Sequence, residues 1–168
     1  MNVMLNLLNS NIHGMSNRDL ENIAKKCVKN FKGVYPSDSF PTLSVCDLKQ
    51  SAIIFNLSPH NEEGSHFVSV YIKNNEAYYF DSYGKPLENT DIKTFLNKHF
   101  HFIYYNSKKI QSETSIFCSL FSLSFLLFMQ NPKASYKNFI ELFSNCQQKN
   151  DVFVTHFIKN LLCNVNNK

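Results

Sequence analysis

The sequence predicts an α+β domain, in which one helix precedes a group of β-strands and several helices follow them. Three observations support this prediction: an amphipathic segment near the start, apolar or alternating segments between residues 51 and 105, and helical periodicity beyond residue 115. A chain of 168 residues, 43% of them hydrophobic, can bury one sizeable core. We expect a single domain over residues 16–168. Residues 1–15 form an extension that could be a leader, an added strand or a segment removed by self-cleavage near Gly14.

The first helix is predicted over residues 17–30. Ser16, followed three positions later by Asp19, resembles a capping box with Asp in place of Glu. Apolar residues then recur at helical spacing: Leu20, Ile23, Ala24, Cys27, Val28 and Phe31. The glycine and prolines that follow predict a loop over residues 32–41.

Strands are predicted in the middle of the chain. Residues 51–57 are short and apolar, and residues 66–73 alternate. Asn74-Asn75 suits a tight turn because Asn tolerates positive φ, so residues 76–84 would return as the second arm of a hairpin. Residues 100–105 form a further strand. Helices are expected over residues 90–98, 115–130, 136–146 and 151–163, the last of them capped by Asn150 or Asp151.

Composition and cysteine spacing exclude several classes of protein. The five cysteines lack CxxC or Cys/His spacing, so neither a disulfide framework nor a zinc site is predicted, and reducing surroundings fit best. No secretion signal is recognised at the N-terminus. The longest apolar segment, residues 116–129, is shorter than the ~20 residues of a membrane span and is predicted to be a core helix. The net charge of +4 permits contact with a polyanion but does not require it.

The segment QSETSIFCSLFSLSFLLFMQ, residues 111–130, joins a polar run to an almost wholly apolar helix. If Ser115 is the N-cap, Cys118 occupies position N3, where free backbone N–H groups and the helix dipole favour a thiolate. A cysteine in an apolar helix is also commonly a small core residue. The position alone leaves both roles open.

A nucleophilic cysteine needs a base, and His66, at the start of a predicted strand, is a candidate. If Asn74-Asn75 is a two-residue turn, His66 falls opposite Tyr83, and Asp81 becomes its diagonal neighbour within reach. A three-residue turn would move Asp81 to the other face of the strand. The pattern is therefore consistent with a histidine–carboxylate couple without requiring one.

Gln111 lies seven residues before Cys118, in the loop that leads into the same helix. Its side-chain amide could donate to a developing oxyanion together with the Cys118 N–H. A single glutamine does not by itself predict an oxyanion-binding site. Its value lies in completing a set with a histidine, an acid and a cysteine.

The segments GSHFVSVYI, YYFDSYGKPL and QSETSIFCSLFSLSF resemble, in order and spacing, the adenovirus-type maturation proteases and their relatives in Polinton/Maverick elements, adintoviruses and virophages. FKGVYPSDSFP is similar to a further segment of that family, so the likeness spans residues 16–130. The resemblance implies an adenain-like, papain-like cysteine peptidase fold, with a mixed, mostly antiparallel sheet and a buried helix that bears the nucleophile. It implies these catalytic residues: His66, Asp81, Gln111 and Cys118.

Three features depart from the family pattern. Ser119 stands where the family has Gly, so a Cβ beside the nucleophile would crowd a substrate backbone or shift the helix start. Phe67 replaces a common Trp. No cysteine lies between Cys46 and Cys118, so an activating peptide has no thiol there for disulfide capture.

From the resemblance we expect a viral or virus-like-element maturation protease that cleaves capsid or core precursors after Gly in small-residue motifs and requires no cofactor. We expect a monomer with protein substrates and no membrane contact, located in the host nucleus or cytoplasm and packaged in the virion. Two alternatives stay open: a protease that removes ubiquitin- or SUMO-like modifiers, and an inactive binding module on the same fold. The SUMO-deconjugating proteases share the same residue order more distantly.

Contact with DNA, and activation by DNA or by a peptide, also stay open. Basic residues at two places suggest non-specific DNA binding: Lys25, Lys26, Lys29, Lys32, Lys108 and Lys109. A solvated helix face and loop would explain the same residues equally well. The sequence therefore does not decide between the two interpretations.

Overall fold

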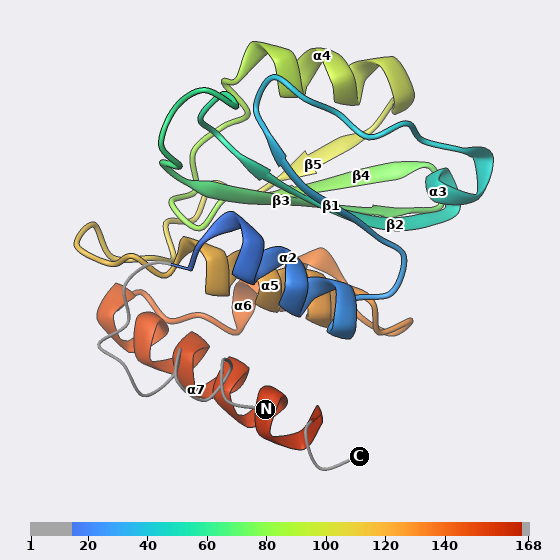
Figure 1. Cartoon of the computed structure of the whole chain (residues 1–168). Coiled ribbons are helices and arrows are strands. Elements are labelled where there is room, and N and C mark those ends of the chain that lie inside the picture. Colours follow the sequence, from blue (N-terminus) through green and yellow to red (C-terminus); the bar gives the residue numbers. More distant parts are fainter. Residues whose placement is uncertain (1–14, 166–168) are drawn as a thin grey trace.

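The computed structural model describes residues 15–165, with side chains to residue 160, and confirms the predicted α+β architecture (Figure 1). The elements follow in this order: α2 (Asn17–Cys27), β1 (Phe31–Pro36), α3 (Val45–Lys49), β2 (Gln50–Asn56), β3 (Phe67–Lys73), β4 (Glu76–Phe80), α4 (Thr90–His99), β5 (Ile103–Tyr105), α5 (Cys118–Met129), α6 (Tyr136–Glu141) and α7 (Gln147–Val165). Of the predicted extension, residues 1–15, all but Met15 lies outside the described residues.

A five-stranded mixed sheet in the order β1-β2-β3-β4-β5 forms the centre of the fold. The long central pairs, β2–β3 and β3–β4, are antiparallel, and the outer pairs are parallel. The predicted two-residue turn between β3 and β4 is confirmed: Lys73 pairs with Glu76, and Asn74 and Asn75 have φ values of 53° and 62°. Both angles lie in the left-handed region that Asn tolerates. β5 occupies only the end of the strand predicted over residues 100–105.

β1 corrects the predicted loop over residues 32–41. It pairs in parallel with β2, and the register shifts between Phe31 and Gly33, where φ is 141°. β1 lies at the edge of the sheet, where a glycine irregularity and a proline such as Pro36 are tolerated. Glycine and proline therefore argue against a strand at the centre of a sheet, but they do not exclude a strand at its edge.

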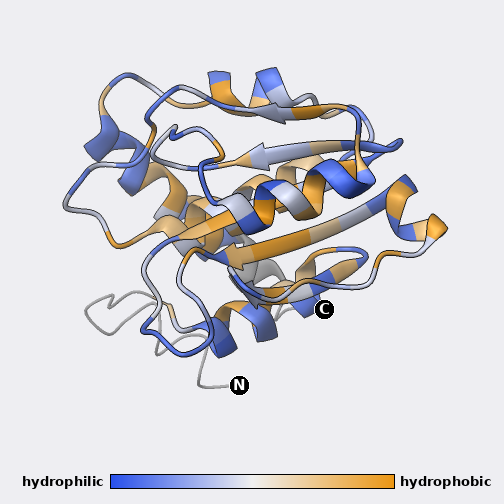
Figure 2. Cartoon of the chain, turned by 90° about the horizontal axis from the view of Figure 1, so that it is seen from above, coloured by the Kyte–Doolittle hydropathy of each residue, from blue (hydrophilic) through white to orange (hydrophobic). Residues whose placement is uncertain are grey.

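Helices cover the two faces of the sheet unequally (Figure 1). On one face, α5 packs with α2, α6 and α7 around a core that includes Tyr71, Phe80 and Phe125. On the other face, α4 packs through Ile92 and Phe95. α5 is buried on nearly every side, which explains why its sequence has no polar face. Figure 2 shows hydrophobic residues gathered in the interior and hydrophilic residues toward the outer loops.

Several helix boundaries differ from the prediction. α2 ends at Cys27 rather than at residue 30, and α6 ends at Glu141 rather than at residue 146. α7 begins at Gln147, so Asn150 and Asp151 lie inside the helix and do not cap it. Their side chains bind a distant loop instead, which makes them unavailable as caps. Within residues 15–165, no helix is both long and apolar enough to cross a membrane.

Candidate active site

His66 and Asp81 meet at the end of the sheet, just before β3 begins and just after β4 ends. His66 Nε2 lies 2.8 Å from Asp81 Oδ1. The His66 side chain is 12% exposed and that of Asp81 is 1% exposed. Asp81 Oδ1 also accepts a hydrogen bond of 2.8 Å from the Tyr83 N–H, which helps to fix the orientation of the carboxylate. The predicted contact between the imidazole and the carboxylate is therefore present.

The contact between His66 and Asp81 does not arise from the predicted diagonal pair of strand residues. The β3–β4 ladder ends at the pair Ser69–Phe80, so His66 and Tyr83 do not face one another across a sheet. After Phe80 the chain turns, and the side chain of Asp81 closes that turn through the Tyr83 N–H. The turn brings the Tyr83 ring to the imidazole, with ring centroids 4.7 Å apart.

The surroundings of His66 favour its protonated form. Burial alone would lower the pKa of His66, but the hydrogen bond with Asp81 and the proximity of the Cys118 sulfur outweigh this effect and raise the pKa to about 9. Because Nε2 faces Asp81, Nδ1 is the ring nitrogen left for Cys118. Burial and the nearby acidic groups, Cys118 and Asp81 among them, raise the pKa of Tyr83, whose hydroxyl therefore stays protonated.

Cys118 begins α5, but not at the predicted cap position. Phe117, rather than Ser115, is the N-cap, so Cys118 is N1 and not N3. The carbonyl of an N-cap accepts the first intrahelical hydrogen bond. Ser115 O instead accepts from Gln111 Nε2 at 2.8 Å, whereas Phe117 O accepts from the Phe121 N–H at 3.0 Å. The Cys118 N–H still belongs to the first turn, whose donors have no intrahelical partner, at the positive end of the helix dipole.

Gln111 is fully buried beside this helix start. Its Oε1 accepts a hydrogen bond of 2.6 Å from the Ser82 hydroxyl, and its Nε2 donates to Ser115 O. Tyr83 Oη lies 3.5 Å from the same Nε2, a long second contact. The amide thus connects the turn after β4 to the loop before Cys118, and its second N–H is only weakly engaged.

Asn106 and Ser82, which the sequence analysis did not single out, hold these two segments together. Asn106 is buried, donates to Asp81 O at 2.7 Å and accepts from the Asp81 N–H at 3.0 Å. Ser82 O accepts from the N–H groups of Ile110 at 2.8 Å and Gln111 at 2.9 Å. The turn that carries Asp81 and the loop that carries Gln111 are therefore one hydrogen-bonded unit.

α7 holds the Gln111 loop from another side. Asn150 Nδ2 donates to Ile110 O at 3.0 Å. Asp151 accepts from the Ser112 hydroxyl at 2.5 Å and, more weakly, from its N–H at 3.5 Å. Asn150 is 3% exposed and Asp151 is 8% exposed. The residues on both sides of Gln111 are therefore fixed by one buried helix turn.

Asn56, at the end of β2, holds the loop before His66 in place through hydrogen bonds. Its Oδ1 accepts from the N–H groups of Ser58 at 3.1 Å and Ser65 at 3.2 Å. A Cβ on Gly64 would lie 2.4 Å from Asn56 Nδ2, so a larger residue there would displace the Asn56 amide. The glycine and serine before His66 are the only sequence signal for this arrangement, and they do not identify Asn56.

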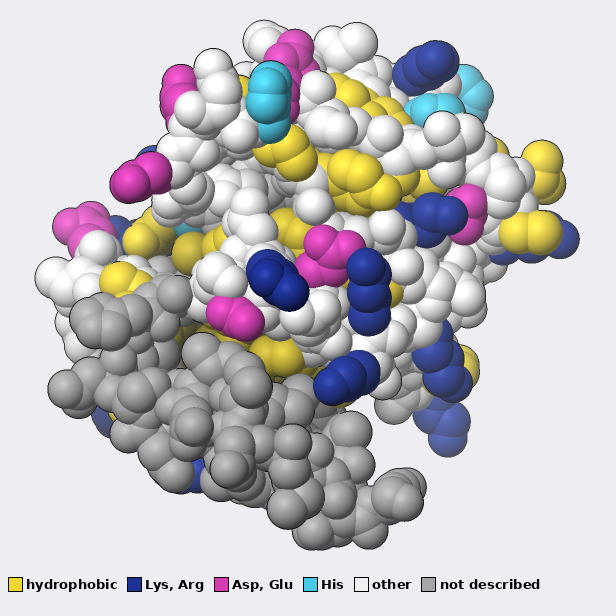
Figure 3. Space-filling view, viewed as in Figure 1, with side chains coloured by type: hydrophobic (Ala, Val, Ile, Leu, Met, Phe, Trp, Pro, Cys, Tyr) yellow, Lys and Arg dark blue, Asp and Glu magenta, His cyan; other side chains and the backbone are white. Residues whose placement is uncertain are grey.

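The lysines considered for DNA contact are mostly engaged within the chain. Lys25 pairs with Glu21 at 2.6 Å, Lys32 with Asp47 at 3.0 Å and Lys109 with Glu113 at 2.6 Å. Lys108 Nζ donates to Phe143 O. Lys26 and Lys29 have no ion-pair partner among the described residues. On the face shown in Figure 3, Lys and Arg side chains are interspersed with Asp and Glu. DNA contact stays a prediction.

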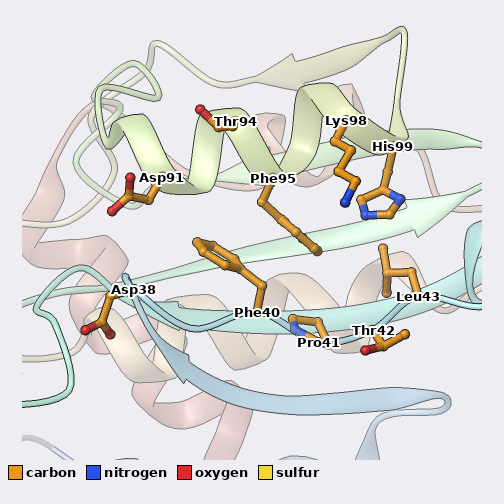
Figure 4. A pocket seen from close by; sticks show the side chains of 10 residues that line it. All are labelled: Asp38, Phe40, Pro41, Thr42, Leu43, Asp91, Thr94, Phe95, Lys98 and His99. Carbon is orange, nitrogen blue, oxygen red and sulfur yellow. The ribbon is translucent and has the colours of Figure 1, made fainter.

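Two cavities differ in their position relative to His66 and Cys118. The larger, of about 510 Å³, lies on the opposite face of the sheet, between α4 and residues 38–43, where Phe40 stacks on Phe95 (Figure 4). The smaller, of about 310 Å³, is lined by Tyr83, Lys85, Lys109 and Glu113. No group of three His, Cys, Asp or Glu side chains in the described part of the chain could hold a metal ion.

No protein-family model matches the chain, and no curated protein matches its sequence. The structure of SUMO protease Ulp1 with its catalytic cysteine oxidised to a sulfinic acid is similar over 94% of this chain and 85% of that chain, with a TM-score of 0.50 and 15% identity. ASFV pS273R protease is similar over 64% of this chain, with a TM-score of 0.43 and 20% identity, and this chain spans only 43% of its length. The likeness to the SUMO protease shows that the chain has a papain-like cysteine protease fold.

Proposed function

We propose that the chain is a cysteine endopeptidase in which Cys118 is the nucleophile and His66 the general base and acid. One observation carries this proposal: the His66 imidazole is hydrogen-bonded to Asp81 at 2.8 Å and lies near enough to the Cys118 sulfur, at the N-terminus of a buried helix, for that group to raise its pKa. A thiol, an imidazole and an orienting carboxylate are the groups that nucleophilic catalysis uses. The shared fold supports the proposal by analogy only.

The reaction would run in two halves. His66, oriented by Asp81, holds the proton of the thiol as an imidazolium, and the Cys118 thiolate attacks the scissile carbonyl carbon to form a tetrahedral oxyanion. His66 then gives the proton to the amine nitrogen, the C–N bond breaks and a thioester remains. Water next loses a proton to His66 and attacks the thioester, which releases a carboxylic acid and regenerates the thiol.

The oxyanion would be stabilised by two donors. The Cys118 N–H belongs to the first helical turn, whose N–H groups lack intrahelical acceptors. Gln111 Nε2 has one N–H bonded to Ser115 O and a second whose contact with Tyr83 Oη, at 3.5 Å, is long. A weakly engaged N–H can turn toward a developing negative charge without breaking a strong hydrogen bond.

For the substrate we propose capsid or core precursor proteins of a virus or virus-like element, cleaved after Gly in small-residue motifs. The resemblance of the segments around His66, Asp81 and Cys118 to the adenovirus-type maturation proteases supports this assignment. A reducing intracellular site of action and packaging in the virion would follow from it. The second candidate is a protease for ubiquitin- or SUMO-like modifiers, favoured by a fold similar to that of the SUMO protease over 94% of this chain.

A side-by-side cleavage assay tests the proposal. Peptides with small residues before Gly are compared with a folded modifier whose C-terminal Gly-Gly is fused to a reporter protein, and new termini are mapped by mass spectrometry. We expect the peptides to be cleaved after Gly by the unaltered chain and not by Cys118→Ala. Preferential cleavage of the modifier fusion would favour the second candidate. Cleavage of neither substrate, or cleavage that persists in Cys118→Ala, would contradict the proposed activity.

A further inference from the structure

The smaller cavity is built from the two segments that carry Asp81 and Gln111. Tyr83 and Lys85 follow Asp81 in the turn after β4, and Lys109 and Glu113 lie two positions to either side of Gln111. The segments touch directly, because a Cβ on Gly84 would lie 2.6 Å from the carbonyl carbon of Lys108. Gly84 also has a φ of 66°, which disfavours any larger residue. The cavity therefore has a fixed position relative to the proposed catalytic residues.

Tyr83 connects this cavity to the reacting groups. Its ring lies 4.7 Å from that of His66, and its hydroxyl lies 3.5 Å from both Gln111 Nε2 and Ser115 O. The same side chain lines the cavity. Tyr83 is therefore shared by the surroundings of His66 and Gln111 and by the lining of the cavity.

The positive and negative charges that line the cavity do not balance. Lys109 pairs with Glu113 at 2.6 Å, so those two charges offset one another. Lys85 has no carboxylate within ion-pair distance among the described residues. Its Nζ lies 5.8 Å from the centroid of the Tyr83 ring, near the outer limit of a cation–π contact. One positive charge is therefore uncompensated and loosely held.

We propose that this cavity, lined by Tyr83, Lys85, Lys109 and Glu113, is a substrate subsite that receives an acidic side chain. The proposal rests on the proposed peptidase function and adds the substrate's charge at one position. Lys85 supplies the attraction, Tyr83 provides an apolar wall for the methylene groups, and Lys109 shields the incoming carboxylate from Glu113. The contact is solvated, so its effect on cleavage is modest and falls with salt.

A peptide series tests this subsite. Glu is placed in turn at each of four positions on either side of the scissile bond, and each peptide is matched by one with Gln at the same position. At one position we expect kcat/KM to be about threefold higher for Glu than for Gln at low salt, with the ratio falling toward one as salt rises. Lys85→Glu should reverse the ratio, and Lys85→Gln should remove it.

Lys93→Glu is the matched control, because it makes the same charge change on α4, on the opposite face of the sheet. It should leave the Glu-to-Gln ratio as in the unaltered chain. Equal rates for Glu and Gln at every position, or a preference for Glu that survives Lys85→Glu, would overturn the subsite while the peptidase activity stands. If no peptide is cleaved, the proposed function fails and the subsite fails with it.

Discussion

The two faces of the sheet differ in what they bury. On the α4 face the core is made of hydrophobic side chains, and the larger cavity of about 510 Å³ lies between two segments of chain (Figure 4). On the α5 face the hydrophobic core borders a group of buried polar residues: Asp81, Ser82, Asn106, Gln111, Ser112, Asn150 and Asp151. The smaller cavity lies beside this group.

Cavity size and buried polar contacts therefore point to different faces of this molecule. The charged groups that line the α4 cavity, such as Asp91 and Lys98, are exposed. Solvent screens exposed charges, so their interactions with neighbouring groups contribute little free energy. The polar residues of the α5 face are buried and hydrogen-bonded, so each has one favoured position. Fixed positions are what acid–base and nucleophilic chemistry need.

The largest expected effect is on the α5 face. His66→Ala removes the group that we propose to transfer the proton, and we expect kcat/KM for a cleaved peptide to fall by about 10³-fold. The variant should still fold but with lower stability, because the His66 side chain is only 12% exposed and is hydrogen-bonded to Asp81. Peptide kinetics together with circular dichroism check both statements. A folded His66→Ala variant with most of its activity would exclude a role for this imidazole.

The charge of His66 should also appear in the pH dependence of stability. The pKa of His66 is about 9 in the folded chain and 6.5 for an unperturbed histidine, so folding favours the protonated ring. The resulting stabilisation, on the order of 3 kcal/mol, is fully present below pH 6.5 and is lost as the pH rises toward 9. Asp81→Asn removes a main cause of the shift. Urea unfolding at a series of pH values should show the advantage of the unaltered chain over Asp81→Asn shrinking across this range, whereas an advantage that grows with pH would contradict the assignment.

On the α4 face, a substitution should affect stability and spare activity. Phe95→Ala removes a buried ring that stacks on Phe40 at 4.9 Å, and we expect it to lower the free energy of unfolding by about 3 kcal/mol. The kcat of the folded fraction should be unchanged, because none of the proposed catalytic residues lies on this face. Urea unfolding and active-site titration measure the two quantities separately. A fall in kcat beyond the loss of folded protein would mean that the two faces are coupled.

The smallest effect concerns the hydrogen bonds that hold the Gln111 loop. Asp151→Asn keeps the shape of the side chain but weakens its charge-assisted bonds to Ser112, and we expect kcat to fall about fivefold. If Asp151 acts by positioning Gln111, the same change in a Gln111→Ala background should cause no further fall. Independent losses in the double variant would show that Asp151 has only a general structural role.

Much of this site follows from local sequence signals. The Asn74-Asn75 turn sets the register of the β3–β4 hairpin. The almost wholly apolar segment after Gln111 predicts a buried helix with Cys118 near its start. Asn106, Asn150 and Asp151 could not be found in this way, because the contacts that join them to the Asp81 turn and the Gln111 loop span 25 to 40 residues of sequence. Contacts over such separations leave no periodic pattern in the sequence.

Two predicted elements differ from the structure for reasons that residue type alone does not show. β1 contains Gly33 and Pro36, which indicate a loop unless one knows that the strand lies at the edge of the sheet. Ser115 is a good N-cap residue by type, but its carbonyl is bound by Gln111, so the helix starts at Cys118. The strand depends on its place in the sheet, and the helix start depends on a hydrogen bond from a residue four positions earlier in the chain.

The central claim is that the Cys118 sulfur is activated by His66. The native chain can be treated at neutral pH with less than one equivalent of iodoacetamide, and the labelled cysteines can be mapped by mass spectrometry. Cys46 and Cys146 are exposed, whereas Cys118 is only partly so. We expect Cys118 to be alkylated before either of them, and this preference to disappear in His66→Ala. Labelling of Cys46 and Cys146 first, with Cys118 left unmodified, would contradict the claim.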